Sequence, residues 1–272
     1  MGMAKLIEFP IPRQSRASIS QANMEGAPKS TTQLLIETPI IRHAMFLLAE
    51  AGGDVGIKLT DTGALNRKFV QTFWDQFSLD QDQRFRPMRE IDCPEVARIR
   101  ELLEIKEYVQ IANRSLRLTA RGIGALKDGP TFQLYRNLFD AGLLVWNWAC
   151  EDRFPEFEFI QNSGAEMIEK LWHWPNSTLT AVEFSDGLFH LVNEHGEAVH
   201  MTYQDGPLLG FDTYEAMVHC LNLRFFVRFC VPFGILVDLG PARWMMSPKD
   251  LYQRSEFFIS DFPRAFGAAE DQ

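Results

Sequence analysis

Basic side chains that could bind phosphate gather around a predicted hairpin in the first half of the chain. Residues 107–121, EYVQIANRSLRLTAR, place short apolar runs on either side of Asn113-Arg114, which predicts two strands joined by a tight turn. Arginine suits phosphate because its planar guanidinium donates paired hydrogen bonds. The candidate nucleic-acid-binding residues are the basic residues of this region: Arg67, Lys68, Arg98, Arg114, Arg117 and Arg121.

Acidic residues alternate with the arginines on the segment that precedes this hairpin. Residues 94–107 hold Arg98 and Arg100, and the same segment holds four glutamates: Glu95, Glu101, Glu104 and Glu107. Such alternation is typical of a solvent-facing, ion-paired helix surface. The sequence therefore leaves open whether this face meets DNA or serves another purpose.

Two histidines, His190 and His200, are the best candidates for a metal site. A turn between them would place them opposite each other on neighbouring strands, where they could supply two zinc ligands. A closed zinc site needs four ligands, and no cysteine or carboxylate clearly joins this pair. We therefore expect ordinary histidines, with no metal and no cofactor.

The chain lacks the short motifs that typically mark catalytic or nucleotide-binding sites. The patterns GxGxxG, GxxxxGKS/T, HExxH, GxSxG and CxxC are absent. We expect a non-enzymatic protein, and an unrecognised hydrolase or nuclease is the least favoured alternative.

The basic residues lie among apolar patterns that predict a definite order of elements. Between residues 37 and 128, the apolar periods predict helix, short strand, helix, helix, hairpin and helix. This is the order of a winged helix, in which the first strand joins the hairpin in one small sheet. We expect a flexible N-terminal tail at 1–32 and a winged-helix-like domain at 33–130.

A second winged-helix-like unit is expected at residues 131–265. A gapless shift of 128 residues places the first hairpin on four residues of the second half: Val237, Leu239, Trp244 and Met246. Ser247 would then cap the next helix, with Pro248 in its first turn.

Residues 178–203 interrupt this second unit with alternating apolar and polar residues. The alternation predicts a three-stranded antiparallel meander, and Asp186-Gly187 would form its first turn. The expected fold class is therefore helix-rich α+β, with two winged-helix-like units and a small β-meander inserted in the second.

The charge of the chain is divided unevenly between its halves. Residues 1–130 carry 18 Lys and Arg against 16 Asp and Glu, whereas residues 131–272 carry 9 against 20, which together give the net charge of -9. We expect two kinds of partner: double-stranded DNA for the first half, and a protein or a second copy of the chain, forming a homodimer, for the acidic half. No apolar run reaches the roughly 18 residues of a membrane helix, and no signal peptide is evident, so we expect a cytoplasmic protein with no membrane partner.

The segment KLTDTGALNRKFV, with IRELLEIKEYVQIANRSLRLTARG some 40 residues later, resembles a family of uncharacterised bacterial winged-helix-like proteins. Proteins of this family carry a K-L-T-x-x-G-x-L signature and are found on plasmids and genomic islands. The resemblance covers residues 40–127 and rests on ten residues: Lys58, Leu59, Thr60, Gly63, Leu65, Val70, Leu103, Leu118, Thr119 and Gly122. It implies a fold and no particular activity.

Two functions follow from these patterns as expectations. The first is a regulatory or adaptor protein that binds DNA, or a DNA-associated complex, through the arginines of residues 64–121. The second is an acidic protein-interaction module with a winged-helix fold that does not bind DNA, and that could mimic DNA towards a basic partner.

Overall fold

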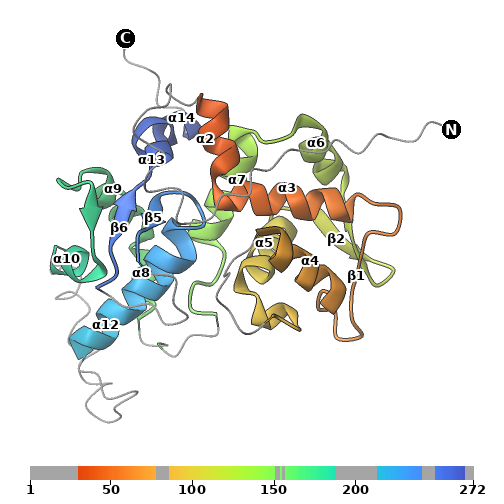
Figure 1. The fold of residues 1–272 in the computed structure, drawn as a ribbon, viewed down its shortest axis with the longest axis horizontal. Helices are drawn as coiled ribbons and strands as arrows, with labels where there is room; N and C mark the ends of the chain where they lie inside the picture. The colour runs from red at the N-terminus through yellow and green to blue at the C-terminus, as the bar shows by residue number, and fades with distance from the viewer. Residues whose placement is uncertain are drawn as a thin grey trace. The chain divides into compact units, whose positions relative to one another are not determined.

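Residues 31–128 adopt the order of elements that their apolar periods predict (Figure 1). In this computed structural model the described residues are 30–77, 86–150, 154, 157–187, 213–240 and 249–266. The helices of the first part are α2 (Thr31–Glu37), α3 (Pro39–Ala51), α4 (Arg67–Phe77), the 3-10 turn η1 (Glu90–Asp92), α5 (Pro94–Ile105) and α6 (Ala120–Asp128). Its strands are β1 (Ile57–Lys58), β2 (Val109–Ala112) and β3 (Ser115–Leu118).

These strands form a small antiparallel sheet in the order β1-β3-β2. Val109 pairs with Leu118 across β2 and β3, so the predicted hairpin is confirmed. Its turn lies at Asn113 and Arg114, whose φ angles are 52° and 59°. Positive φ at both central residues is typical of type I′ turns, whose twist matches that of the flanking strands.

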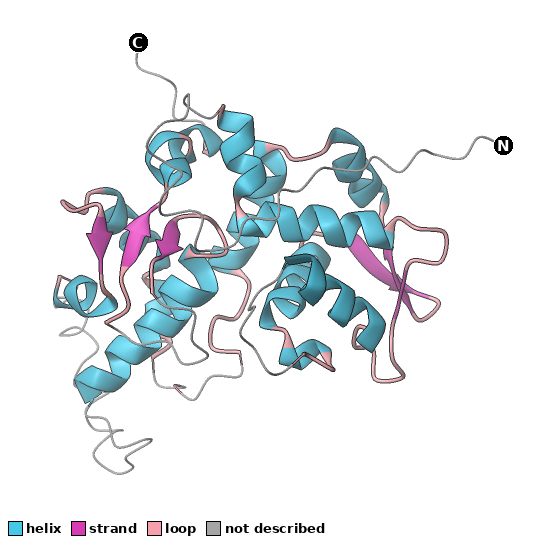
Figure 2. Ribbon diagram, in the orientation of Figure 1, coloured by secondary structure: helices cyan, strands magenta, loops and turns pink. Residues whose placement is uncertain are grey.

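The second part is also rich in helices, and Figure 2 shows its strands in magenta. Its helices are α7 (Phe132–Leu144), α8 (Phe159–Asn162), α9 (Gly164–Trp172), α10 (Ala181–Asp186), α12 (Thr213–Leu221), the π-helix η2 (Asn222–Cys230), α13 (Glu256–Ser260) and α14 (Phe262–Ala265). Its strands are β4 (Thr178–Leu179), β5 (Leu236–Asp238) and β6 (Tyr252–Arg254), in the order β4-β6-β5. The described residues therefore form a helix-rich α+β protein with small antiparallel sheets.

The prediction of a meander at 178–203 is wrong where the structure describes it. Only Thr178 and Leu179 are a strand, and α10 follows at once because Thr180 and Glu183 form a capping box. The Glu183 amide donates to Thr180 Oγ1 (3.2 Å), and the Thr180 amide donates to Glu183 Oε2 (2.8 Å). These reciprocal bonds favour a helix start over a strand. Residues 188–203 lie outside the described residues.

The two parts share one hydrogen-bonded connection between a helix and the strand that follows it. The Tyr108 amide donates to the Leu103 carbonyl at the end of α5 (2.8 Å). The Ile235 amide donates in the same way to the Cys230 carbonyl at the end of η2 (2.8 Å), which sets an offset of 127 residues. Each connection also has one residue in the left-handed region, and these are Glu107 (φ 57°) and Gly234 (φ 67°).

The cap that follows the last strand is repeated as well. Thr119 Oγ1 accepts from the Gly122 amide (3.1 Å) at the start of α6, and Ser255 Oγ accepts from the Phe258 amide (2.9 Å) at the start of α13. The offset has grown to 136 residues here, so the loop between β5 and β6 is nine residues longer than the turn between β2 and β3. The sheet orders β1-β3-β2 and β4-β6-β5 correspond strand by strand.

This longer loop corrects the predicted second hairpin. Val237 pairs with Gln253 in β6, whereas the gapless shift expected the return strand around Trp244 and Met246, which lie outside the described residues. β6 is instead anchored by Tyr252, which is fully buried and donates its hydroxyl hydrogen bond to Asn222 (2.9 Å). The exit helix α13 begins after Ser255, so the predicted cap at Ser247 is also wrong.

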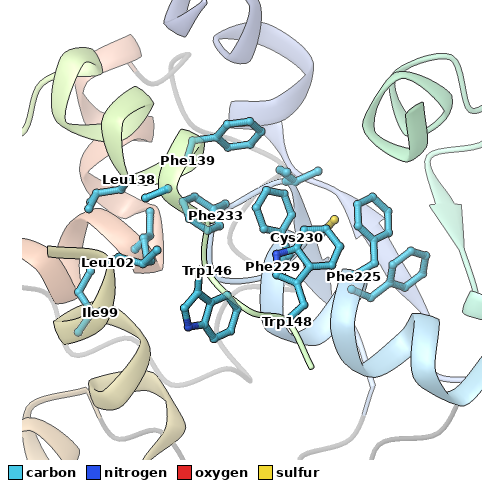
Figure 3. Packing of buried hydrophobic residues seen from close by; sticks show 14 of the residues in the cluster. Ile99, Leu102, Leu138, Phe139, Trp146, Trp148, Phe225, Phe229, Cys230 and Phe233 are labelled. Atoms are coloured by element: carbon cyan, nitrogen blue, oxygen red, sulfur yellow. The ribbon is translucent and has the colours of Figure 1, made fainter. Parts of the chain in front are cut away.

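One hydrophobic core runs through the described parts of both halves (Figure 3). Ile99 and Leu102 of α5 belong to the same cluster as Leu138 of α7 and Phe229 of η2. Residues 31–272 form one compact unit, so the expected domains 33–130 and 131–265 share their interior. The expected tail 1–32 differs at its end, because Thr31 already begins α2 and residues 1–29 lie outside the described residues. No helix in the described ranges combines the length and the apolar character needed to cross a membrane.

Candidate functional site

The arginines of α5 do not form the exposed basic face that the sequence led us to expect. Arg98 is only 7% exposed, and its guanidinium lies over the ring of Trp146, 5.3 Å from the ring centroid. Burial lowers the pKa of Arg98 to about 10, which still leaves the side chain cationic near neutral pH. Arg98 therefore points into the protein, and this position corrects its assignment as an exposed phosphate contact.

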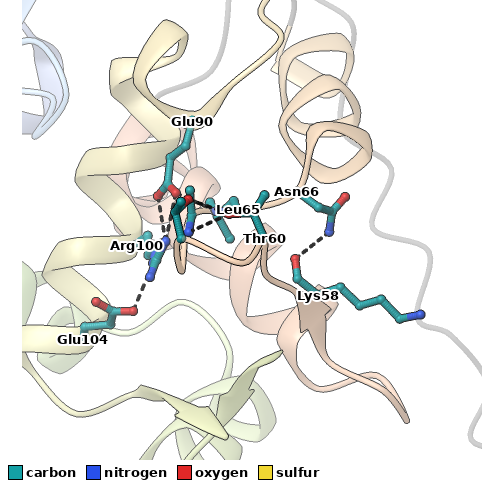
Figure 4. A network of polar contacts seen from close by, with 9 residues as sticks. Lys58, Thr60, Leu65, Asn66, Glu90, Arg100 and Glu104 are labelled. Carbon is teal, nitrogen blue, oxygen red and sulfur yellow. Dashed lines mark hydrogen bonds and ion pairs between the residues drawn. The ribbon is translucent and has the colours of Figure 1, made fainter. Parts of the chain in front are cut away.

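Arg100 on the same helix is held by two carboxylates (Figure 4). Its Nη1 donates to Glu90 Oε2 (2.8 Å), and its Nε donates to Glu104 Oε1 (3.0 Å). Glu90 Oε2 also accepts from the Leu65 amide (2.6 Å), which lies just before α4. This network ties α5, η1 and the loop after β1 together, so Arg100 is committed to the structure.

The remaining polar face of α5 is largely covered by protein. Glu101 accepts a hydrogen bond from the indole Nε1 of Trp146 (2.8 Å), a residue that follows α7. α5 also packs against α3 and α7. A helix covered in this way cannot insert into the major groove of DNA without first separating from these neighbours.

A second group of basic residues lies where β1, the start of α4 and the hairpin turn meet, and we call it the basic edge. The Leu59 amide donates to the Arg114 carbonyl (2.9 Å), which joins β1 to the turn. The Asn66 side chain donates to the Lys58 carbonyl (2.6 Å), which joins β1 to α4 (Figure 4). The basic edge consists of Lys58, Arg67, Lys68 and Arg114, and all four side chains are exposed.

The members of the basic edge differ in how far they are neutralised. Arg114 forms an exposed ion pair with Asp61. Lys58, Arg67 and Lys68 have no carboxylate within ion-pair distance in the described part of the chain. Three cations therefore remain available for an anionic partner, and only Arg67 and Lys68 were among the sequence candidates. Lys58 was missed, although its alternation with the buried Ile57 on β1 was the signal that it faces outward.

Arg117 and Arg121 lie close to this edge and have structural partners. The two terminal nitrogens of Arg117 donate to the carbonyls of Asp54 and Val55 (3.2 Å each), while its Nε is enclosed without a partner. Arg117 therefore supports the loop before β1. The exposed Arg121 lies 4.6 Å from the centroid of the Tyr108 ring, an arrangement that leaves its charge accessible.

The metal candidates His190 and His200 fall outside the described residues. Within the ranges that the structure describes, no group of three or more His, Cys, Asp or Glu side chains is arranged to hold a metal ion.

Comparison with known proteins places a family boundary close to the first part of the fold. No curated protein and no solved structure matches the chain. Residues 36–130, about a third of the chain, match the family model described as the Y4jL N-terminal domain. The matched segment begins just before α3 and ends just after α6, so the chain is similar to this family over the helices and strands that carry the basic edge.

Proposed function

We propose that residues 36–130 are a winged-helix domain and that the protein is a non-enzymatic regulatory or adaptor protein that binds duplex DNA through the basic edge. The observation that carries this proposal is the meeting of β1, α4 and the hairpin turn, which exposes Lys58, Arg67 and Lys68 together without carboxylate partners in the described chain. Clustered cations bind the DNA backbone by releasing its condensed counterions.

The contact would be made mainly to phosphates, because α5 is not available to read bases. In DNA-bound winged helices the helix before the hairpin enters the major groove. Here that helix buries Arg98, pairs Arg100 and packs on α7. Phosphate contacts position a protein on the duplex but carry no direct sequence information. We therefore expect little discrimination between duplexes of different sequence and a steep dependence on salt.

Fluorescence anisotropy with two labelled duplexes of unrelated sequence tests this proposal. The wild-type protein should bind both, and affinity should fall steeply between about 50 and 200 mM salt. Replacing Lys58, Arg67 and Lys68 together by alanine should reduce the slope of log K against log salt by about 2–3, because each phosphate contact contributes about 0.9.

The matched control replaces Arg86 and Arg89 by alanine, two exposed arginines that already pair with Asp75 and Asp92. This variant should keep most of the wild-type affinity and slope. An equal loss in both variants would mean that net charge alone, and not the basic edge, governs binding. Absence of binding at low salt would end the DNA proposal.

A protein-interaction module is the second candidate, and the covered helix α5 favours it. A winged helix whose base-reading helix is packed against its own chain has lost the usual route to DNA. The acidic half of the chain, with 20 Asp and Glu against 9 Lys and Arg, would then offer a surface to a basic protein or to a second copy of the chain. Sedimentation of the protein alone distinguishes the self-association, because a homodimer would double the mass.

A further inference from the structure

Arg98 is a buried cation without a counter-ion in the described structure. It is 7% exposed, and its Nε is enclosed with no hydrogen-bond partner. No described carboxylate lies within ion-pair distance of it, in contrast to Arg100 two residues later, which contacts Glu90 and Glu104. Burying an unpaired charge is costly, so buried arginines are nearly always paired with an anion.

The surroundings of Arg98 hold its guanidinium in place and add a second positive charge. The Trp146 ring that lies against the guanidinium is itself oriented by its hydrogen bond to Glu101. Arg228 of η2 reaches the same region and donates through Nη1 to the carbonyls of Trp148 and Cys150 (2.7 Å each). Arg228 is near enough to disfavour the charge of Arg98, an effect that Glu95 opposes.

We propose that Arg98, supported by Trp146 and Arg228, forms a binding site for a small oxyanion, such as a phosphate or carboxylate group. The argument is that a fixed, desolvated guanidinium with an unused donor and a second cation beside it lacks only the anion. A planar guanidinium recognises the oxygens of phosphate and carboxylate through paired, charge-assisted hydrogen bonds. The aromatic ring lies against the guanidinium and leaves the guanidinium edge for the oxyanion.

This site is separate from the basic edge. Its arginines come from α5 and η2, one from each half of the chain, whereas the basic edge consists of exposed residues of the first half. A bound oxyanion would therefore join the two halves through charge, and its loss would leave the DNA contact intact. The two proposals can fail independently.

Thermal unfolding in different anions tests the site with the full-length protein. Inorganic phosphate, adenosine monophosphate and acetate are each compared with chloride at equal ionic strength. A ligand that binds only the folded state raises the unfolding midpoint, and at about ten times its Kd the rise should be about 2–5 °C. A rise with inorganic phosphate identifies a free phosphate site, a rise with the nucleotide alone identifies a phosphate ester site, and a rise with acetate alone identifies a carboxylate site. No rise with any of the three overturns the proposal.

Substitution of Arg98 decides whether the anion binds where we infer. Arg98→Met should abolish the rise, and its midpoint in chloride should equal or exceed that of the wild type, because an unpaired buried charge has been removed. Arg121→Met, which also removes an arginine from an aromatic ring, should keep the full rise. A rise that persists in Arg98→Met places the anion elsewhere and overturns the proposal.

Arg98→Lys provides a second measurement if the methionine variant fails to fold. Lysine keeps the charge but loses the planar pair of donors, so the Kd for the anion should weaken by about tenfold or more. An unchanged Kd would contradict the site. The variant that lacks Lys58, Arg67 and Lys68 should retain the wild-type rise, which separates this site from the basic edge.

Discussion

Arg100 is the residue whose ion pairs bear most directly on stability. Its side chain and that of Glu90 are only 11% and 12% exposed, and Glu104 completes the network. Arg100→Ala would leave two carboxylates partly buried without their cation. We expect a loss of about 3–5 kcal/mol in the free energy of unfolding, measured by urea denaturation.

Arg86→Ala is the matched control for this prediction. Arg86 pairs with Asp75, but both side chains are more than half exposed (53% and 54%). Solvent screens such a pair, so its loss should cost less than about 1 kcal/mol. Equal losses in the two variants would contradict the view that burial determines the worth of these ion pairs.

His43 gives the protein a predictable response to acid. It is buried beside Phe73 and Phe77, and burial, with the nearby Arg42 and Arg98, lowers its pKa from 6.5 to about 3. The unfolded chain therefore binds the proton more readily than the folded chain. Stability that is fully present above pH 6.5 should be lost towards pH 3, by about 1.4 kcal/mol for each pH unit.

Substitution of His43 tests that response. His43→Phe should remove this part of the slope, measured as urea midpoints between pH 7 and pH 4, because phenylalanine cannot take up the proton. His173→Phe changes an exposed histidine at the end of α9 and should keep the wild-type slope. If His43→Phe loses stability with acid as steeply as the wild type, other groups control the acid response.

At the scale of elements, the close approach of α6 to the chain before β2 depends on a glycine. A Cβ atom at Gly122 would lie 2.0 Å from the Tyr108 carbonyl oxygen, which also accepts hydrogen bonds from Thr119. Gly122→Ala should therefore destabilise the protein by about 1–3 kcal/mol, because backbone must move. The same helix contains Gly124, where an added Cβ meets nothing within 4 Å.

Gly124→Ala should have the opposite sign and stabilise the protein by about 0.5–1 kcal/mol, since alanine loses less conformational freedom in a helix. Thermal or urea unfolding of the two variants checks both signs. If both substitutions destabilise equally, helix packing at Tyr108 is not the cause.

At the scale of the whole molecule, the shared core predicts that the first part will not fold well by itself. Ile99 and Leu102 of α5 lie in one cluster with Leu138, and Trp146 bonds to Glu101. A fragment of residues 31–130 would expose these apolar side chains to water. We expect it to lack cooperative thermal unfolding and to bind the dye ANS, whereas residues 31–266 should unfold cooperatively.

The fragment experiment also bears on the repeated topology. Two units with the same strand order and the same capped connections could each be an independent domain. A dispersed amide NMR spectrum and cooperative unfolding for residues 31–130 would show that independence and would contradict the shared core as a requirement for folding.

The sequence alone determined the features that depend on neighbouring residues. The turn at Asn113-Arg114, the cap at Thr119 and the order of elements from α3 to α6 were all predictable, because each depends on hydrogen bonds or apolar periods within a few residues. The approximate repeat was visible for the same reason. Its gapless alignment was wrong because the length of the loop between β5 and β6 leaves no local signal.

Only the tertiary structure decided what the basic residues can do. Arg98 and Arg100 lie two residues apart, yet one lies against Trp146 and the other pairs with Glu90. Lys58, by contrast, remains exposed on a two-residue strand. The physical reason is that burial and ion pairing depend on groups brought together from distant parts of the chain, and the charge of a residue type does not determine its surroundings.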